Sequence, residues 1–227
     1  VKRFSMLPKI SGDNFRIMWD NAYADHHLSD APDQLANLMA LARHHDTNDS
    51  MVLFGSTSKV TFAGAGISFL GTSREKLGEF EQHLSETMIG FDKVNQLRHV
   101  LFLKDMSGIA RHMARHAALL KPRFALTEKI LSKYLDGKRI GEWSRPNGGY
   151  FVSFDAIPGQ AKEIITLAAN VGVRLTPAGA TFPYGIDPQD RNIRLAPTFP
   201  ALDSLQQALE VFVVCVQLAS VRHYLKS

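Results

Sequence analysis

A short apolar run, Met51 to Phe54, ends at Gly55 and leads directly into Ser56-Thr57-Ser58-Lys59. This pattern predicts a strand that stops at a glycine turn, and it places one lysine among hydroxyls and small residues. Lysines usually lie on solvated surfaces among other charges. An amine in these surroundings can lose its water shell and act as a nucleophile. Lys59 is therefore the first candidate for chemistry, although a Ser-x-Ser-Lys tetrapeptide by itself also fits an ordinary turn.

The hydroxyls of Ser56 and Ser58, with the backbone N–H groups beside them, are suited to binding an anion. A nucleophilic amine next to an anion site fits a phosphorylated aldehyde that the lysine can hold as a Schiff base. Pyridoxal 5′-phosphate is a cofactor with that chemistry, and it is the cofactor that we expect here.

The composition excludes several other classes. The 227 residues are 45% hydrophobic and 21% charged, with a formal net charge of +4, which is ordinary for one large domain or two small ones. No apolar stretch reaches the roughly 18 residues of a membrane span. The basic residues form no run with aromatics, so a nucleic-acid partner is not expected. Cys215 is the single cysteine, which rules out an internal disulfide framework and favours a cytoplasmic protein.

Metal binding is not expected either. The histidine pairs His26-His27 and His44-His45 have no cysteines or carboxylates at a convincing ligand spacing. We interpret both pairs as solvated or capping residues.

Periodicity predicts an α/β chain. In the first part we expect a buried strand over 15–19, further strands over 51–54 and 67–70, and a helix over 33–45. Helical patterns fill 73–137, including one long helix over 105–135 that is kinked at Pro122. The last part predicts strands over 148–154, 172–175 and 191–196 and helices over 160–171 and 201–224. In α/β sheets, ligands bind at the carboxyl ends of the strands, where both Asp20 and Lys59 fall.

Three further residues complete a constellation. Asp20 can pair with a protonated pyridine nitrogen, and Tyr23 can hydrogen-bond the ring's phenolate oxygen. Arg194, on a short apolar strand, offers a bidentate fork for a substrate carboxylate. The alternatives are a helix-capping aspartate, a packed tyrosine and a structural ion pair. Arg191 competes with Arg194, but it lies in a polar run and is expected to be exposed.

Asp20-Asn21-Ala22-Tyr23, then Ser56-Thr57-Ser58-Lys59, then 192–197 in the form Asn-Ile-Arg-Leu-Ala-Pro occur in this order. Together they resemble the fold-type I aminotransferases of the aspartate aminotransferase superfamily. The sequences of residues 55–64 and 143–151 resemble the MocR-like aspartate aminotransferase branch. The resemblance covers essentially the whole chain.

The resemblance implies a PLP-dependent transferase fold of type I, in its C-terminal part only. Residues 1–118 would form the remaining half of the large three-layer α/β/α domain, including the start of the interdomain helix. Residues 119–227 would form the small C-terminal α+β domain. The complete protein would be a homodimer that transfers an amino group between an amino acid, such as aspartate, and a 2-oxo acid.

The resemblance also implies a role for each site residue. Lys59 would form the Schiff base and move the proton between the substrate and the cofactor. Asp20 would pair with the pyridinium nitrogen, Tyr23 would bond the phenolate oxygen, and Ser56 and Ser58 would bind the phosphate. The α-carboxylate of the substrate would be bound by Arg194.

Two departures from the family pattern matter. Most relatives have a phosphate-binding arginine seven or eight residues after the lysine, where this chain has Gly66 and Ile67. A complete relative is also nearly twice as long, and its upstream half would supply the ring-stacking aromatic, an asparagine and a phosphate-binding turn. We therefore expect this chain alone to have little or no transaminase activity. Its strand edges, left without the upstream half, would be prone to association.

Other functions remain open at this point. The same fold serves as the effector-binding domain of MocR/GntR-type transcription regulators, which carry an upstream DNA-binding domain. A decarboxylase or lyase that uses the same lysine is a third possibility. The preference for aspartate follows from the family branch alone.

Overall fold

The computed structural model describes residues 1–29 and 31–226, and these form two compact units. Unit 1 comprises Val1–Asp25 and Asp33–Ala114, and unit 2 comprises His26–Pro32 and Arg115–Ser227. The long helix α5 (Met106–Leu135) continues from the first unit into the second. The predicted α/β class is confirmed. The domain boundary that the resemblance implies between residues 118 and 119 stays a prediction.

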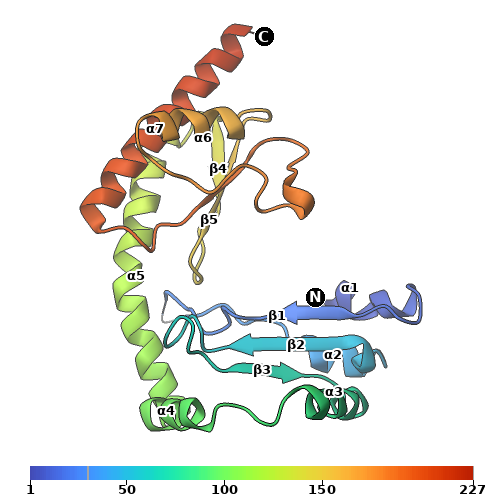
Figure 1. Cartoon of the computed structure of the whole chain (residues 1–227). Helices are drawn as coiled ribbons and strands as arrows, with labels where there is room; N and C mark the ends of the chain where they lie inside the picture. The colour runs from blue at the N-terminus through green and yellow to red at the C-terminus, as the bar shows by residue number, and fades with distance from the viewer. Residues whose placement is uncertain (30, 227) are drawn as a thin grey trace. The chain divides into compact units, whose positions relative to one another are not determined.

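Unit 1 contains a mixed three-stranded sheet with the order β1-β2-β3 (Figure 1). Its strands are β1 (Ile17–Asp20), β2 (Met51–Ser56) and β3 (Ser68–Gly71). Strands β1 and β2 are parallel, in a register that runs from Ile17 opposite Met51 to Asp20 opposite Phe54. Strand β3 is antiparallel to β2. The parallel pair brings the carboxyl ends of β1 and β2 to one edge.

The helices of unit 1 begin at polar caps. The α-helices are α1 (Lys2–Met6), α2 (Leu38–His44), α3 (Arg74–Thr87) and α4 (Lys93–Leu103), and the 3-10 turns are η1 (Leu7–Lys9) and η2 (Asn48–Ser50). Asn37, Ser73 and Asp92 each accept a backbone N–H bond at the start of α2, α3 and α4. The helix predicted from residue 33 therefore begins at Leu38, after the Asn37 cap.

The core of unit 1 is small. Its buried hydrophobic cluster consists of Leu38, Ala42 and Met51, with four partly buried neighbours. Strand β1 was predicted to be buried, and this is wrong, because its residues alternate between half-buried and exposed. The Met18 side chain is 73% exposed. One face of β1 is thus uncovered by the described residues.

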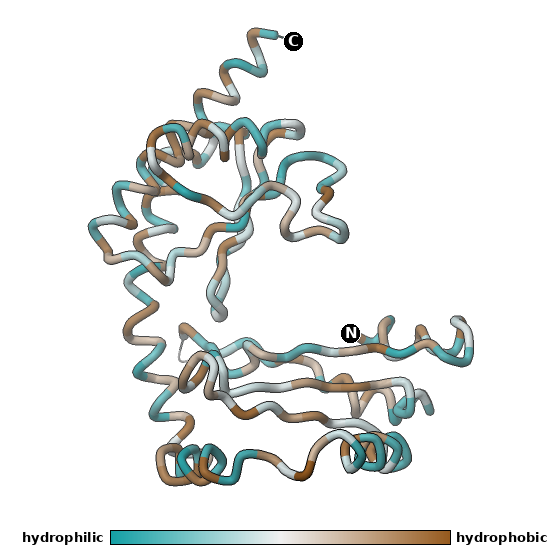
Figure 2. The backbone as a smooth tube through the Cα atoms, in the orientation of Figure 1, coloured by the Kyte–Doolittle hydropathy of each residue, from teal (hydrophilic) through white to brown (hydrophobic). Residues whose placement is uncertain are grey.

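Unit 2 is built on an antiparallel sheet with the order β4-β5-β6. Its strands are β4 (Gly141–Trp143), β5 (Val152–Ala156) and β6 (Asn192–Leu195). The helices that accompany them, besides α5, are α6 (Ala161–Asn170), α7 (Leu202–Lys226) and the 3-10 turn η3 (Pro183–Gly185). Alternate residues of β5 and β6 are buried against these helices, which makes one continuous core. Hydropathy alternates along α5 and α7, as in amphipathic helices (Figure 2).

Two predictions for unit 2 need correction. Residues 172–175 were predicted to be a strand, but they form a turn and extended chain outside the sheet. Strand β4 was not predicted. Helix α7 is long and apolar enough to cross a membrane by length and composition alone. Seven of its eight buried residues, including Phe212 and Cys215, pack into the core of unit 2, as in a core helix.

Candidate active site

Five of the six predicted site residues lie in unit 1, at or just after the carboxyl ends of β1 and β2. Asp20 is the last residue of β1 and pairs with Phe54 of β2. The pairing continues one step further, where Asn21 N donates to Phe54 O at 2.9 Å. Ser56 ends β2, and Ser58 and Lys59 follow it. The parallel register is what brings the two motifs to the same edge.

Asp20 and Tyr23 belong to the turn that follows β1. Asp20 Oδ1 accepts a hydrogen bond from Ala22 N at 3.2 Å, which fixes the first residues of this turn. The Asp20 side chain is exposed, and the Tyr23 ring is 39% exposed. Asp20 thus stabilises the turn after β1, and the residues that follow it form this turn and not a helix that Asp20 could cap.

Ser56 and Ser58 form a hydroxyl pair. Ser56 Oγ donates to Ser58 Oγ at 2.7 Å and accepts from Ser58 N at 3.0 Å. Beyond them, Val60 N and Thr61 N both donate to Thr57 O, at 2.9 and 2.8 Å, and this makes a tight turn. Lys59 lies on the outside of that turn.

Lys59 is exposed in this chain. The sequence predicted an amine shielded from water by small apolar residues, and that prediction is wrong for the described residues. The position of Lys59 is set by the turn beneath it, because the side chain is not packed into a core. A ligand or protein segment that removes water from this amine must therefore cover the carboxyl ends of β1 and β2.

The chain returns to β2 after this turn. Thr57 N donates to Ile67 O at 2.9 Å, and Ile67 N donates to Thr57 Oγ1 at 2.8 Å. We call residues 57–67 the lysine loop. Gly66, one of the two positions where relatives carry an arginine, packs directly on the backbone of Ser58.

Three side chains that the sequence did not single out hold the lysine loop. They are Asn95 and His99 of α4 and His112 of α5. His112 Nε2 lies 2.7 Å from the carbonyl oxygen of Val60, next to Lys59. A histidine and an asparagine one turn apart on a helix are too common to be read as a loop anchor from sequence alone.

Arg194 lies in unit 2, in the middle of β6, between the buried residues Ile193 and Leu195. Its guanidinium carbon is 4.6 Å from the centre of the Phe151 ring, and its Nε donates to Thr176 Oγ1 at 3.4 Å. Stacking on an aromatic face fixes the plane of the guanidinium while its outer N–H groups stay directed away from the ring.

Arg191 was predicted to be exposed, and this is wrong. Its side chain is about two-thirds covered and lies 3.7 Å from Asp155 Oδ2. Asp187 organises the same stretch, because its Oδ2 accepts from Arg191 N and Asn192 N, both at 2.8 Å. Although partial burial opposes ionisation of Asp187, these backbone hydrogen bonds lower its pKa below the usual value. Arg191 thus serves an internal ion pair, and Arg194 stays the candidate for binding a ligand carboxylate.

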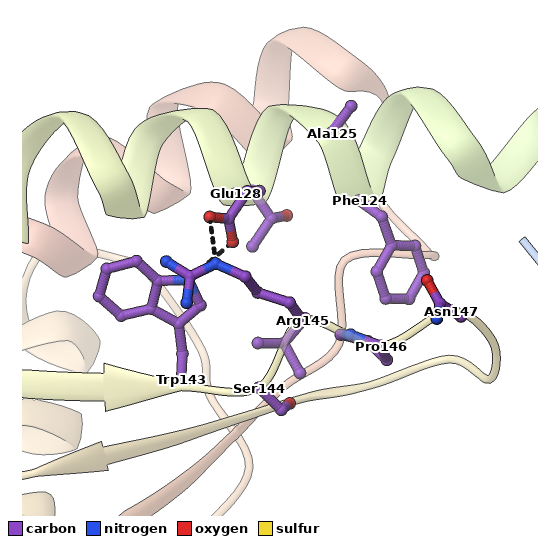
Figure 3. A pocket seen from close by; sticks show the side chains of 10 residues that line it. Phe124, Ala125, Glu128, Trp143, Ser144, Arg145, Pro146 and Asn147 are labelled. Atoms are coloured by element: carbon purple, nitrogen blue, oxygen red, sulfur yellow. Dashed lines mark hydrogen bonds and ion pairs between the residues drawn. The ribbon is translucent and has the colours of Figure 1, made fainter. Parts of the chain in front are cut away.

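Unit 2 also has an open pocket of ≈ 240 Å³ between α5 and the chain around β4 and β5 (Figure 3). Glu128 lies in it and accepts from Trp143 Nε1 at 2.8 Å and from Arg145 Nε at 2.7 Å. Burial raises the pKa of Glu128, but the hydrogen bonds from Trp143, Arg145 and Ser132 outweigh it and lower the pKa overall. The charged groups here neutralise each other, so the hydrogen bonds of Glu128 in this pocket have a structural role.

The histidines complete the comparison with the sequence. His26 was interpreted as solvated or capping, and this is wrong, because it is 3% exposed and its ring lies 5.0 Å from the Tyr150 ring. Within residues 1–29 and 31–226, no three histidine, cysteine or carboxylate side chains gather in a way that could hold a metal ion.

Comparison with known proteins gives one consistent family. The model of the family described as aspartate amino-transferase matches residues 1–227. A Mycolicibacterium smegmatis protein, named as a provisional aminotransferase, is 44% identical over 220 residues, which are 97% of this chain and 51% of that protein. An aspartate aminotransferase of Corynebacterium glutamicum is 39% identical over 224 residues, which are 99% of this chain and 52% of that protein. The chain thus spans about half the length of these curated relatives.

Solved structures agree. A crystal structure of an aspartate transaminase from Corynebacterium glutamicum has a TM-score of 0.94 at 39% identity, over 98% of this chain and 52% of that one. An α-aminoadipate aminotransferase from Thermus thermophilus, solved with N-(5′-phosphopyridoxyl)-L-leucine, has a TM-score of 0.75 at 19% identity, over 97% of this chain and 54% of that one. The second likeness shows the shared fold.

Proposed function

We propose, from the premise that this chain belongs to the aspartate aminotransferase family, that it carries the lysine of a pyridoxal-phosphate-dependent aminotransferase. The observation that carries the proposal is the edge of unit 1 formed by β1 and β2. There the parallel register collects one carboxylate, one phenol, two hydroxyls and one primary amine. We propose further that its substrates are aspartate or a similar amino acid and a 2-oxo acid.

The residues at this edge fit the cofactor by the chemistry of their donors and acceptors. When bound, pyridoxal phosphate supplies an electron sink for the bond that breaks at the substrate α-carbon. Asp20 would hold a proton on the pyridine nitrogen, since its carboxylate is a charged acceptor. Tyr23 would donate to the phenolate oxygen of the ring.

Lys59 has two roles in this proposal. Its amine would condense with the aldehyde carbon with loss of water, and, once the amine of the substrate has displaced it there, it would take a proton from the substrate α-carbon and pass it to the former aldehyde carbon. An exposed lysine on a rigid turn suits both roles, because the amine can reach either atom while its backbone stays fixed. The amine loses water when the ring and substrate cover this edge.

The two anions, the phosphate of the cofactor and the carboxylate of the substrate, have separate candidate binding groups. Ser56 and Ser58 would bind the phosphate through their hydroxyls and the adjacent N–H groups. Since Gly66 packs on Ser58, position 66 has no room for an arginine, and other groups must provide the remaining contacts. Arg194, stacked on Phe151, would bind the substrate carboxylate.

We also propose that the complete protein is a cytoplasmic homodimer with no membrane or nucleic-acid partner. Its assignment to the MocR-like branch stays a prediction from the wording of 55–64 and 143–151.

The decisive experiment asks whether Lys59 captures the cofactor. The chain is incubated with pyridoxal 5′-phosphate, reduced with borohydride and digested, and each lysine-containing peptide is weighed. We expect the reduced adduct at Lys59 well above its level at Lys162, an exposed lysine of α6. Lys59→Ala should abolish the corresponding absorbance band, while Lys162→Ala should leave it unchanged. Equal labelling of the two lysines would contradict the proposal.

The carboxylate role of Arg194 is tested by Arg194→Lys, which keeps the charge and removes the planar fork. In a preparation that turns over aspartate with 2-oxoglutarate, we expect KM for the amino acid to rise roughly tenfold, which corresponds to about 1.4 kcal/mol. Arg191→Lys is the matched control and should leave KM unchanged, since Arg191 serves an internal ion pair.

A further inference from the structure

The lysine loop is attached to helix α4 on both sides of Lys59. Before the lysine, Thr57 Oγ1 lies 3.0 Å from His99 Nε2, and Thr61 Oγ1, just after it, lies 2.9 Å from the same atom. On the returning side, Asn95 Nδ2 donates to the carbonyl oxygen of Ala65 at 2.9 Å. Two side chains one helical turn apart therefore span the loop.

The hydrogen bonds define the state of the His99 ring. Its Nδ1 lies 2.9 Å from the carbonyl oxygen of Asn95, which can only accept, so Nδ1 carries a proton. With Nδ1 as the donor, Nε2 of the neutral ring accepts from Thr57 Oγ1, while Thr61 Oγ1, 2.9 Å from the same nitrogen, donates to the carbonyl oxygen of Thr57 at 3.2 Å. Thr57 Oγ1 accepts in turn from Ile67 N at 2.8 Å. A continuous chain of hydrogen bonds thus runs from α4 to the residue that closes the loop.

His99, at the centre of this hydrogen-bond network, is buried, although Lys59 is not. His99 is 5% exposed, whereas Lys59 is exposed. A buried imidazole that is contacted at both of its ring nitrogens is held in one position, and hydrogen bonds of buried groups are costly to leave unmade. The network therefore fixes the turn beneath Lys59 from below, with no contact to Lys59 itself required.

We propose that His99 is a positioning residue for Lys59. It holds Thr57 and Thr61 through the contacts of its Nε2, and so sets where the amine stands relative to the hydroxyls of Ser56 and Ser58. The inference rests on the proposed function, because positioning matters here only if Lys59 captures the cofactor. Asn95 acts with His99 by holding the returning side.

A matched pair of variants separates the two nitrogens of His99. The amide of His99→Gln can place an oxygen near the Nε2 position, where it accepts from the threonine hydroxyls. The amide of His99→Asn reaches only as far as Nδ1, so it keeps the bond to Asn95 O and loses the threonines. Thr57→Val and Thr57→Ser form a second pair, since the valine lacks the hydroxyl that the serine keeps.

The first measurement is amide hydrogen exchange in the peptide over 57–67, without cofactor. We expect exchange to become about five- to tenfold faster in His99→Asn, as for the loss of one buried hydrogen bond. His99→Gln should stay within about twofold of the unmodified chain. Unchanged exchange in both His99→Asn and Thr57→Val would overturn the proposal. The threonine pair decides the result if His99→Asn does not fold.

The second measurement is borohydride capture of pyridoxal 5′-phosphate at Lys59, relative to Lys162. Capture should fall about five- to tenfold in His99→Asn and Thr57→Val and recover in His99→Gln and Thr57→Ser. Faster exchange with unchanged capture would show that the network only stabilises the loop, and would refute positioning. Absence of selective capture in the unmodified chain would instead contradict the proposed function, and the positioning role of His99 would fall with it.

Discussion

Gly66 lies against Ser58 so closely that a β carbon at position 66 would come within 2.5 Å of Ser58 Oγ and 2.7 Å of Ser58 N. Of the three atoms nearest to that β carbon, two belong to the Ser58 backbone, which cannot turn aside as a flexible side chain could. The two sides of the lysine loop are thus in direct contact at this point. The contact holds the hydroxyl pair and the lysine in one compact turn.

Gly66→Ala should therefore destabilise the protein by about 1–3 kcal/mol, the usual cost of forcing extra volume into a packed site. Urea unfolding monitored by fluorescence measures the change. Gly78→Ala is the matched control, because nothing lies within 4 Å of the added carbon there and the residue is inside α3. That variant should be stabilised by roughly 0.5–1 kcal/mol. Equal stability of the two variants would contradict the packing described for Gly66.

Gly141 of unit 2 lies close against the ring of Phe154, as Gly66 lies against Ser58. A β carbon at position 141 would come within 2.9 Å of Phe154 Cε2 and closer to the ring tip. Phe154 is fully buried and stacks near Trp143 and Phe212. We expect Gly141→Ala to lower stability by about 1–3 kcal/mol. In the Phe154→Leu background the same change should cost less, because the shorter side chain leaves room. Strict additivity of the two changes would refute the contact.

Glu128 makes the stability of unit 2 depend on pH. Its pKa is lowered in the folded protein, so its contribution is present above its usual pKa of 4.5 and is lost as the pH falls through the lower, folded value. Glu128→Gln should lower Tm by roughly 2–4 °C near neutral pH, allowing for partial solvation. The difference should shrink as the pH falls below 4.5.

Thermal unfolding from neutral pH to about pH 3 tests the Glu128 prediction. Glu142→Gln, an exposed residue of β4, is the control and should match the unmodified chain throughout. A constant Tm difference at every pH would show that Glu128 acts through packing alone.

Phe151 holds the guanidinium of Arg194 by its ring face at 4.6 Å. Loss of a partly exposed cation–π contact weakens the interaction by about 0.5–1 kcal/mol. In a preparation that turns over aspartate with 2-oxoglutarate, Phe151→Leu should therefore raise KM for the amino acid about two- to fivefold. Because Arg194 binds substrate in this proposal and takes no part in proton transfer, kcat should be nearly unchanged. Phe199→Leu, at a ring that is 95% exposed, should alter neither constant. A fall in kcat alone would contradict the role assigned to Arg194.

The local patterns of the chain determined most of its elements. The apolar run before Gly55 forms β2, the capping residues Ser73 and Asp92 begin helices, and the long helical pattern becomes α5. These features depend on near neighbours in the sequence, so they can be read from it. Strand β4 could not, because a run as short as Gly141–Trp143 becomes a strand only by pairing with β5.

The same distinction applies to the site. The sequence by itself picked out Lys59 and its hydroxyls, since an isolated lysine after an apolar strand is a local signal. Its exposure, the loop contact between Gly66 and Ser58, and the support from His99 were decided by the tertiary structure. Each depends on residues that are distant in sequence and meet only when β2, the lysine loop and α4 pack together, so no local pattern encodes them.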